Sequence, residues 1–102
     1  MAINIITDSN FDEVKNTDKK VLLDFYADWC GPCRMVSPFV DQIADEHPEF
    51  FVGKINVDEN PVLSAEFQVS SIPMLVVMQN GVVTKKSLGA IPKAQILALL
   101  ED

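Results

Sequence analysis

The sequence predicts an α/β fold in which a mixed central sheet of about five strands lies between two layers of helices, about four in all. Three observations support this prediction. Residues 21–26 and 74–78 are two almost wholly apolar runs, as expected of strands that are covered on both faces. Apolar residues recur with helical spacing after the first run. Asn80-Gly81 favours a tight hairpin, so the second run should continue into an antiparallel neighbour.

The first half of the chain is expected to contain two units of a strand followed by a helix. A short strand at residues 3–7 precedes Asn10 and Glu13, which resemble a capping box that opens a helix through about Asn16. A polar turn then leads into the strand at 21–26, whose one charged residue is Asp24. A longer helix follows the two cysteines, and its apolar face is formed by Met35, Val36, Phe39, Val40, Ile43 and Ala44.

The second half is expected to add a strand, a helix, a hairpin and a last helix. Residues 51–57 alternate like a strand, and Asn60-Pro61 suits the cap and first turn of a short helix to about Phe67. Strands at 74–78 and 82–88 form the hairpin, and a helix from Pro92 to Leu100 ends the chain. No linker or repeat divides the sequence, so residues 1–102 are predicted to form a single domain.

The charge of the chain argues against several classes of partner. Fifteen acidic and eight basic residues give a net charge of −7, which disfavours broad binding to nucleic acid or to anionic membranes. No apolar stretch approaches the roughly 20 residues that span a bilayer. The first residues lack the basic region of a signal peptide. We therefore expect a protein of the reducing cytoplasm that binds neither nucleic acid nor membrane.

Both cysteines of the chain lie in Trp29-Cys30-Gly31-Pro32-Cys33, at the junction of the apolar strand with the longer helix. As a structural disulfide, a loop this small would stabilise the fold by only about 2 kcal/mol in the loop-entropy model. A zinc site normally needs four Cys or His ligands, whereas His47 is the only histidine. Thiol–disulfide exchange is the favoured interpretation. The electrons would then reside on the two sulfurs, so no metal or organic cofactor is expected.

The predicted junction gives the two thiols different tasks. Cys30 would lie near the unpaired N–H groups and the positive end of the helix dipole, which favour its thiolate. Gly31 permits the turn, and Pro32 fixes a backbone angle without presenting an N–H in the first helical turn. Cys33 lies one turn further in, beside any mixed disulfide that Cys30 forms. Cys30 is therefore expected to be the more exposed, attacking thiol, and Cys33 the resolving thiol.

Asp24 is the candidate for the group that removes the proton of Cys33. A carboxyl group within an apolar strand is desolvated, which raises its pKa and suits it to exchange protons near neutral pH. The alternative interpretation is a buried acid that is simply paired. The residues alone leave both possibilities open.

Further motifs follow the cysteines in a characteristic order. With Asp24-Phe25, the cysteine motif, Ile72-Pro73, Asn80-Gly81 and Gly89 all in register, the chain resembles the thioredoxin family over nearly its whole length. This resemblance implies the thioredoxin fold and the same order of attack, Cys30 before Cys33. It also makes Lys54 a candidate partner of Asp24, with an ordinary surface-strand lysine as the alternative, and Pro73 a cis-proline. The implied substrate-docking residues are Trp29, Ile72, Pro73, Gly89 and Ala90.

The main functional hypothesis is a general protein-disulfide reductase. The resemblance implies a monomeric electron carrier that receives electrons from a thioredoxin reductase and passes them to client proteins with disulfides. An oxidase or isomerase on the same fold and a binding module with incidental thiols are the alternatives. Tyr26, Arg34, Ser71 and Met74 depart from residues frequent in the family. These departures leave target preference and redox potential open.

Overall fold

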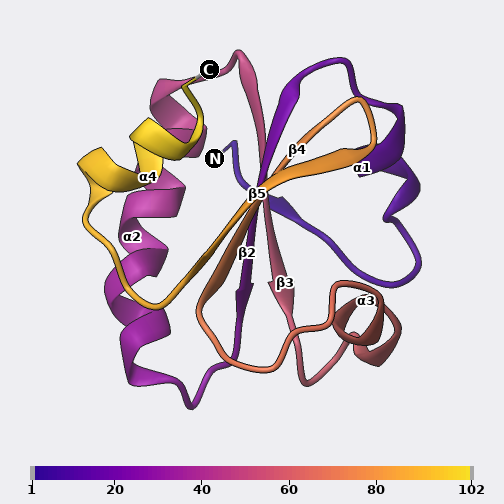
Figure 1. Ribbon diagram of the computed structural model, residues 1–102, viewed down its shortest axis with the longest axis vertical. Coiled ribbons are helices and arrows are strands. Elements are labelled where there is room, and N and C mark those ends of the chain that lie inside the picture. Colours follow the sequence, from indigo (N-terminus) through magenta and orange to yellow (C-terminus); the bar gives the residue numbers. More distant parts are fainter. Residues whose placement is uncertain (1, 102) are drawn as a thin grey trace.

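The computed structural model describes residues 2–101, which form a five-stranded sheet between two pairs of helices (Figure 1). Helices α2 (Gly31–Glu46) and α4 (Lys93–Leu99) cover one face, and α1 (Asp12–Asn16) and α3 (Pro61–Glu66) lie on the other. The strands are β1 (Asn4–Ile5), β2 (Lys20–Tyr26), β3 (Phe50–Asn56), β4 (Met74–Gln79) and β5 (Val82–Leu88). The elements follow the predicted order, so the layered α/β fold is confirmed. Within these residues, no helix has the length and apolar character needed to cross a membrane.

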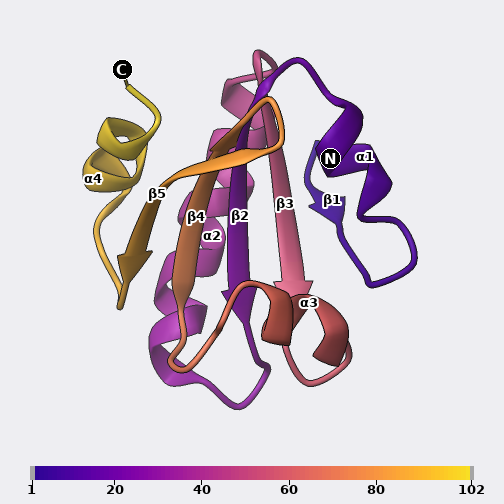
Figure 2. The ribbon, with the colours of Figure 1, turned by 45° about the vertical axis from the view of Figure 1, so that its right-hand side comes forward.

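The order of the strands is β1-β3-β2-β4-β5, with β2 at the centre (Figure 2). Strands β1, β3 and β2 are parallel, whereas β4 is antiparallel to β2 and to β5. Because β4 runs opposite to β2, its first residue, Met74, pairs with Phe25 near the carboxyl end of β2. The ends of β2 and β3 and the start of β4 therefore meet at one edge of the sheet.

The side chains of β2 alternate between two hydrophobic cores, one on each face of the sheet. Leu23 and Phe25 pack in the core beneath α1 and α3, and Leu22 packs in the core beneath α2 and α4. Successive side chains of a strand point to opposite faces, so Asp24 shares the face of Leu22. The strand thus places one carboxyl group inside the apolar layer that α2 covers.

The predicted capping box at the start of α1 is wrong. Helix α1 has no side-chain cap, and the amide of Asn10 closes the turn after β1 instead. Its Oδ1 accepts a hydrogen bond from the Thr7 N–H at 2.7 Å, and its Nδ2 donates to the Ile5 carbonyl at 2.9 Å. The Ile6 N–H still donates to the Lys54 carbonyl of β3 at 2.9 Å, and the turn that Asn10 closes starts at Thr7, so β1 ends at Ile5 and is shorter than the predicted strand at 3–7.

The cap of α3 comes from the loop after β1. The Asp8 carboxylate accepts hydrogen bonds from the N–H groups of Val62 at 3.3 Å and Leu63 at 2.9 Å. Asn60 precedes the helix as predicted, but its side chain does not cap it. Its Oδ1 accepts from the Asp8 N–H, and its Nδ2 donates to the Asn56 carbonyl, both at 2.9 Å. Asp8 and Asn60 thereby tie two distant loops together.

The predicted hairpin between β4 and β5 is confirmed. Asn80 and Gly81 have φ angles of 53° and 80°, and both central residues of a type I′ turn require positive φ. Beyond the turn, β5 is an edge strand with Val82 and Leu88 largely exposed. The Lys85 ammonium folds back onto the carbonyls of Leu99 and Glu101 near the end of α4. A register shift also interrupts the pairing of β4 with β5 at Val77 and Met78.

The cap of α3 yields a first prediction. Asp8→Ala removes the acceptor of two N–H groups in the first turn of the helix, so it should lower the free energy of unfolding by about 1 kcal/mol. Urea unfolding monitored by circular dichroism measures this change. Asp18→Ala, at an exposed acid outside the helices, is the matched control and should change stability little. Equal losses in the two variants would contradict the capping role.

Candidate active site

The two cysteines lie at the start of α2, just after the turn that connects it to β2. This is the end of the sheet at which β2 and β3 both stop. Strand β2 ends at Tyr26, and the Cys30 N–H donates to the Ala27 carbonyl at 3.2 Å in the turn that follows. Cys30 is the N-cap of α2, with extended backbone angles, and Cys33 lies in the first turn. The predicted strand-to-helix junction is therefore confirmed. The carboxyl edge of a parallel strand pair is a usual place for binding sites in α/β proteins.

Cys30 and Cys33 form a disulfide with their Cα atoms 5.3 Å apart. The Cys33 N–H donates to Cys30 Sγ at 3.2 Å, so one of the otherwise unpaired N–H groups of the first turn is directed at this sulfur. In the reduced protein the same N–H favours a thiolate at Cys30 over a thiol. Pro32 occupies the first turn and presents no N–H there, as predicted.

Gly31, which was expected to permit the turn before α2, has a backbone conformation that does not require glycine. Its φ is not positive, and it belongs to the helix rather than to a turn that only glycine can make. A Cβ added at Gly31 would meet no atom within 4 Å. Glycine is therefore not required for packing here. Gly31 lines the hollow beside Cys30.

The expected difference in exposure between the two cysteines is small. Cys30 is 4% exposed and Cys33 is 2% exposed, because both sulfurs are packed between α2 and the neighbouring loops in the disulfide form. The two residues differ in the hollow that each one lines. Cys30 lines an apolar hollow of about 420 Å³, whereas Cys33 lines a separate one of about 200 Å³ beside Tyr26 and Arg34.

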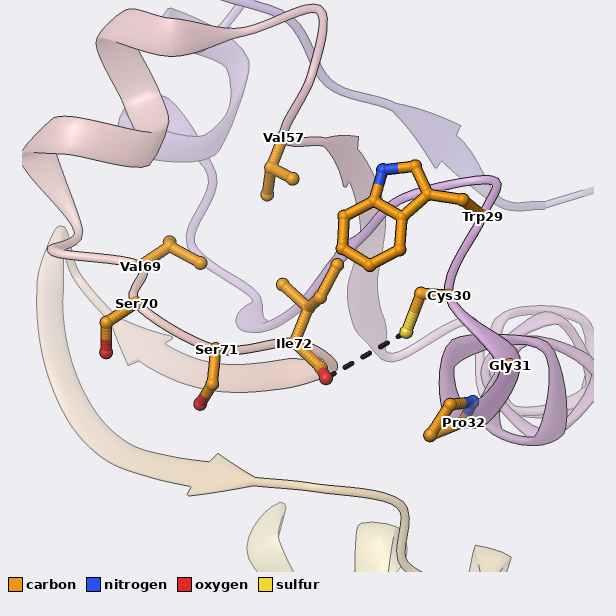
Figure 3. A pocket seen from close by; sticks show the side chains of 9 residues that line it. All are labelled: Trp29, Cys30, Gly31, Pro32, Val57, Val69, Ser70, Ser71 and Ile72. Carbon is orange, nitrogen blue, oxygen red and sulfur yellow. Dashed lines mark hydrogen bonds between the residues drawn. The ribbon is translucent and has the colours of Figure 1, made fainter.

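The larger hollow gathers apolar side chains from several loops around Cys30 (Figure 3). The Trp29 indole stands beside Cys30 and is 67% exposed, and its Nε1 donates to Asp58 Oδ2 at 2.8 Å. The Ile72 carbonyl oxygen lies 3.9 Å from Cys30 Sγ, on the opposite side of the sulfur from the helix. The complete lining is Trp29, Cys30, Gly31, Pro32, Val57, Val69, Ser70, Ser71 and Ile72.

Of the predicted docking residues, the structure places Trp29 and Ile72 in this lining and the other three outside it. The Ile72-Pro73 peptide bond is cis, as the family resemblance implied. Pro73 is buried, and its carbonyl accepts a hydrogen bond from the Gly89 N–H at 2.9 Å. Gly89 is half-buried with φ 89°, and Ala90 is exposed. Gly89 thus braces the loop that carries Ile72.

Sequence reasoning missed three residues of the hollow, Val57, Val69 and Ser70. Val57 directly follows β3, and the convergence of parallel strands at their carboxyl ends is a signal that pointed to it. Val69 and Ser70 lie in the irregular segment before β4. Their position follows from the path of that loop, for which the sequence carried no pattern.

Asp24 is fully buried, and neither of its carboxylate oxygens has a hydrogen-bond partner among residues 2–101. Burial raises the pKa of Asp24 to about 7, the nearby Asp41 carboxylate adds to the rise, and the Lys54 ammonium opposes it. The expected desolvation is therefore confirmed, and Asp24 is not simply paired. The predicted partner, Lys54, forms an ion pair with Asp41 at 2.8 Å instead. It acts on Asp24 through its charge alone.

Comparison with known proteins agrees with this geometry. The thioredoxin family model matches residues 2–102. The chain is 46% identical to thioredoxin from Porphyra purpurea, covering 98% of this chain and 95% of that protein. It is 44% identical to thioredoxin from Alicyclobacillus acidocaldarius, covering 99% and 97% respectively. The chain belongs to the thioredoxin family.

A third relative is the bifunctional thioredoxin reductase/thioredoxin of Mycobacterium leprae, which is 43% identical over the whole of this chain and over 22% of its own length. Membership of the thioredoxin family agrees with the five-stranded mixed sheet and four helices of residues 2–101. The chain has the thioredoxin fold and is an oxidoreductase of disulfides, and it contains the Cys30–Cys33 pair.

The raised pKa of Asp24 predicts a dependence of stability on pH. The pKa rises from an ordinary value of 3.8 to about 7 in the folded chain, so between these values the folded state binds more protons than the unfolded state. Stability therefore falls as the pH rises through this interval. Asp24→Asn removes the penalty and should stabilise the protein by up to about 4 kcal/mol above pH 7, and by little below about pH 4.

Urea unfolding at a series of pH values measures this gain. Asp18→Asn makes the same chemical change at an exposed position and should leave the pH dependence as it is in the parent protein. A gain from Asp24→Asn that does not vary with pH would show that burial of the charge is not its cause.

Proposed function

We propose that the chain is a general protein-disulfide reductase in which Cys30 attacks the target disulfide. The observation that carries this proposal is the position of Cys30: it caps α2, its sulfur accepts an N–H of the first turn, and it is the cysteine that lines the hollow beside Trp29. Cys33 is held within the same turn of helix, so it is always within reach of the sulfur that Cys30 has bonded.

The exchange proceeds in two steps of disulfide substitution. The Cys30 thiolate attacks one sulfur of the target disulfide, which forms a mixed disulfide and releases the other target sulfur as a thiolate. The Cys33 thiolate then attacks Cys30 Sγ, which forms the Cys30–Cys33 disulfide and releases the second target sulfur. Two electrons pass to the target, which takes up two protons, and the chain is left oxidised.

The hollow supplies a place for the target chain. Trp29, Val57, Val69 and Ile72 form an apolar surface beside the sulfur of Cys30. The Ile72 carbonyl lies next to that sulfur and is available to accept a hydrogen bond from an extended segment of the target. Hydrogen bonds to the backbone and apolar contacts depend little on the amino-acid sequence of the target, which suits a reductase of many clients.

Asp24 is the proposed acceptor of the Cys33 proton. Its side chain lies on the face of the sheet that α2 covers, and Cys33 is buried in the first turn of that helix. A carboxyl group whose pKa is about 7 exchanges protons readily near neutral pH. A bridging water completes the path if the two groups are not in direct contact.

We further propose a cytoplasmic monomer that needs no metal or organic cofactor, because the two sulfurs carry the electrons. A thioredoxin reductase is the proposed electron donor, and the Mycobacterium leprae relative, which joins the two names in one chain, supports this pairing. The client proteins carry disulfides, and a net charge of −7 argues against nucleic acid or membrane as partners.

The order of the two cysteines is tested by trapping. Cys33→Ser cannot resolve the mixed disulfide, so it should accumulate as a covalent complex with a disulfide-containing client such as insulin, whereas Cys30→Ser should not. Non-reducing electrophoresis followed by mass spectrometry of the linked peptide identifies the cysteine involved. Equal trapping by the two variants, or trapping through Cys33, would overturn the order.

The role of Asp24 is tested by the rate of insulin reduction with a thioredoxin reductase and NADPH as the electron supply. Asp24→Asn should slow the reaction at pH 7 by as much as about 100-fold, the lower end of what a positioned acid–base group contributes. The rate of the parent protein should rise through about pH 7 as Asp24 loses its proton, and the variant should lack this rise. An unchanged rate and profile would remove Asp24 from the mechanism.

A further inference from the structure

Two side chains of α2 hold the lysine that lies nearest to Asp24. Ser37 and Asp41 are one helical turn apart and both face Lys54 on β3. The Lys54 ammonium donates a hydrogen bond to Ser37 Oγ and forms an ion pair with Asp41 Oδ1 at 2.8 Å. The Lys54 side chain is only 12% exposed, so this ammonium is largely withdrawn from water and depends on its two partners in α2.

Lys54 has a second possible partner on the neighbouring strand. Asp24 and Lys54 are register partners in the parallel pair β2 and β3, and both point to the face of the sheet that α2 covers. An ammonium and a carboxylate placed in this way are expected to form an ion pair. The Asp24 oxygens nevertheless have no hydrogen-bond partner within residues 2–101. The lysine is engaged with α2 instead.

Among residues 2–101, the other surroundings of Asp24 supply no competing cation. On β4 the residue opposite Asp24 is the apolar Leu75, and α4 packs against this face through the apolar Ile96. Tyr26 lies two positions further along the same strand, and α2 adds the thiol of Cys33 when the disulfide is reduced. The charges that act on Asp24 within the described residues are those of Lys54, which favours its ionised form, and Asp41, which disfavours it.

We propose that Ser37 and Asp41 are positioning residues that hold the Lys54 ammonium against α2 and so prevent it from pairing with Asp24. The negative charge of Asp41 also offsets the positive charge of Lys54, so Lys54 stabilises the ionised form of Asp24 less. Ser37 and Asp41 thereby keep the Asp24 carboxyl protonated over a wider range of pH. In a chain where this hold is lost, Lys54 can turn to Asp24, and a carboxylate paired with an ammonium is a poorer proton acceptor.

The inference extends the proposed role of Asp24, but its test does not depend on that role. The measured quantity is the midpoint of Asp24 titration in the oxidised protein, followed by carboxyl-selective NMR. Asp41→Asn should lower the midpoint by about 1 pH unit or more, because it removes one like charge and frees one opposite charge. Ser37→Ala should lower it in the same direction by less, and Asp41→Glu should keep it near that of the parent.

Two controls separate positioning from a general effect of charge. Asp45→Asn makes the same change one turn further along α2, at an exposed acid, and should leave the midpoint unchanged. In a Lys54→Gln background, Asp41→Asn should lose at least half of its effect, since there is no ammonium to release. Equal shifts from Asp41→Asn and Asp45→Asn, or a full shift without Lys54, would overturn the proposal.

The outcome is distinguishable from failure of the catalytic proposal. If Asp24→Asn reduces insulin as fast as the parent protein, Asp24 is not the proton acceptor, yet its midpoint still responds to Asp41. If Asp41→Asn leaves the midpoint of Asp24 titration unchanged while Asp24→Asn slows insulin reduction, the proposed role of Ser37 and Asp41 is wrong. The proposed proton transfer to Asp24 then still stands.

Discussion

The meeting of β2, β3 and β4 at one edge of the sheet is the constraint on which the rest of the site depends. Parallel pairing brings the ends of β2 and β3 together, and antiparallel pairing brings the start of β4 to the same edge. The turn before α2, the residue after β3 and the loop that carries Ile72 must therefore converge. The sulfur of Cys30, at the start of α2, is then surrounded by backbone and apolar side chains from these segments.

The same arrangement explains why an acid is tolerated in the centre of the sheet. The alternation along β2 puts Asp24 on the face where α2 lies, one strand away from Lys54. A buried carboxylate without a partner is unfavourable, and burial raises the pKa of Asp24 to about 7, so that the uncharged form persists up to near neutral pH. Stability is sacrificed at one position, and a group that changes its protonation near neutral pH is obtained in return.

Most of the fold was predictable because its signals are local. Apolar runs identified β2 and β4, Asn80-Gly81 identified the hairpin, and the cysteine motif marked the start of α2. Most of the predictions that failed concern side chains whose partners are distant in the sequence. Asn10 and Asn60 carry the right chemistry for caps, but the tertiary fold gave the α3 cap to Asp8 and used both amides in loops. Lys54 was matched to Asp24 by resemblance, and only the geometry of α2 revealed Asp41 as its ionic partner.

The two outermost strands of the sheet, β1 and β5, determine how readily another chain can pair with it. An open sheet edge is a template on which an unpaired strand of another chain can add. At one edge, β1 has only two residues. At the other, the register shift at Val77 and Met78 breaks the regularity of β5, and Lys85 lies folded over the end of α4. Neither edge therefore offers a long, regular strand with which a second chain could extend the sheet.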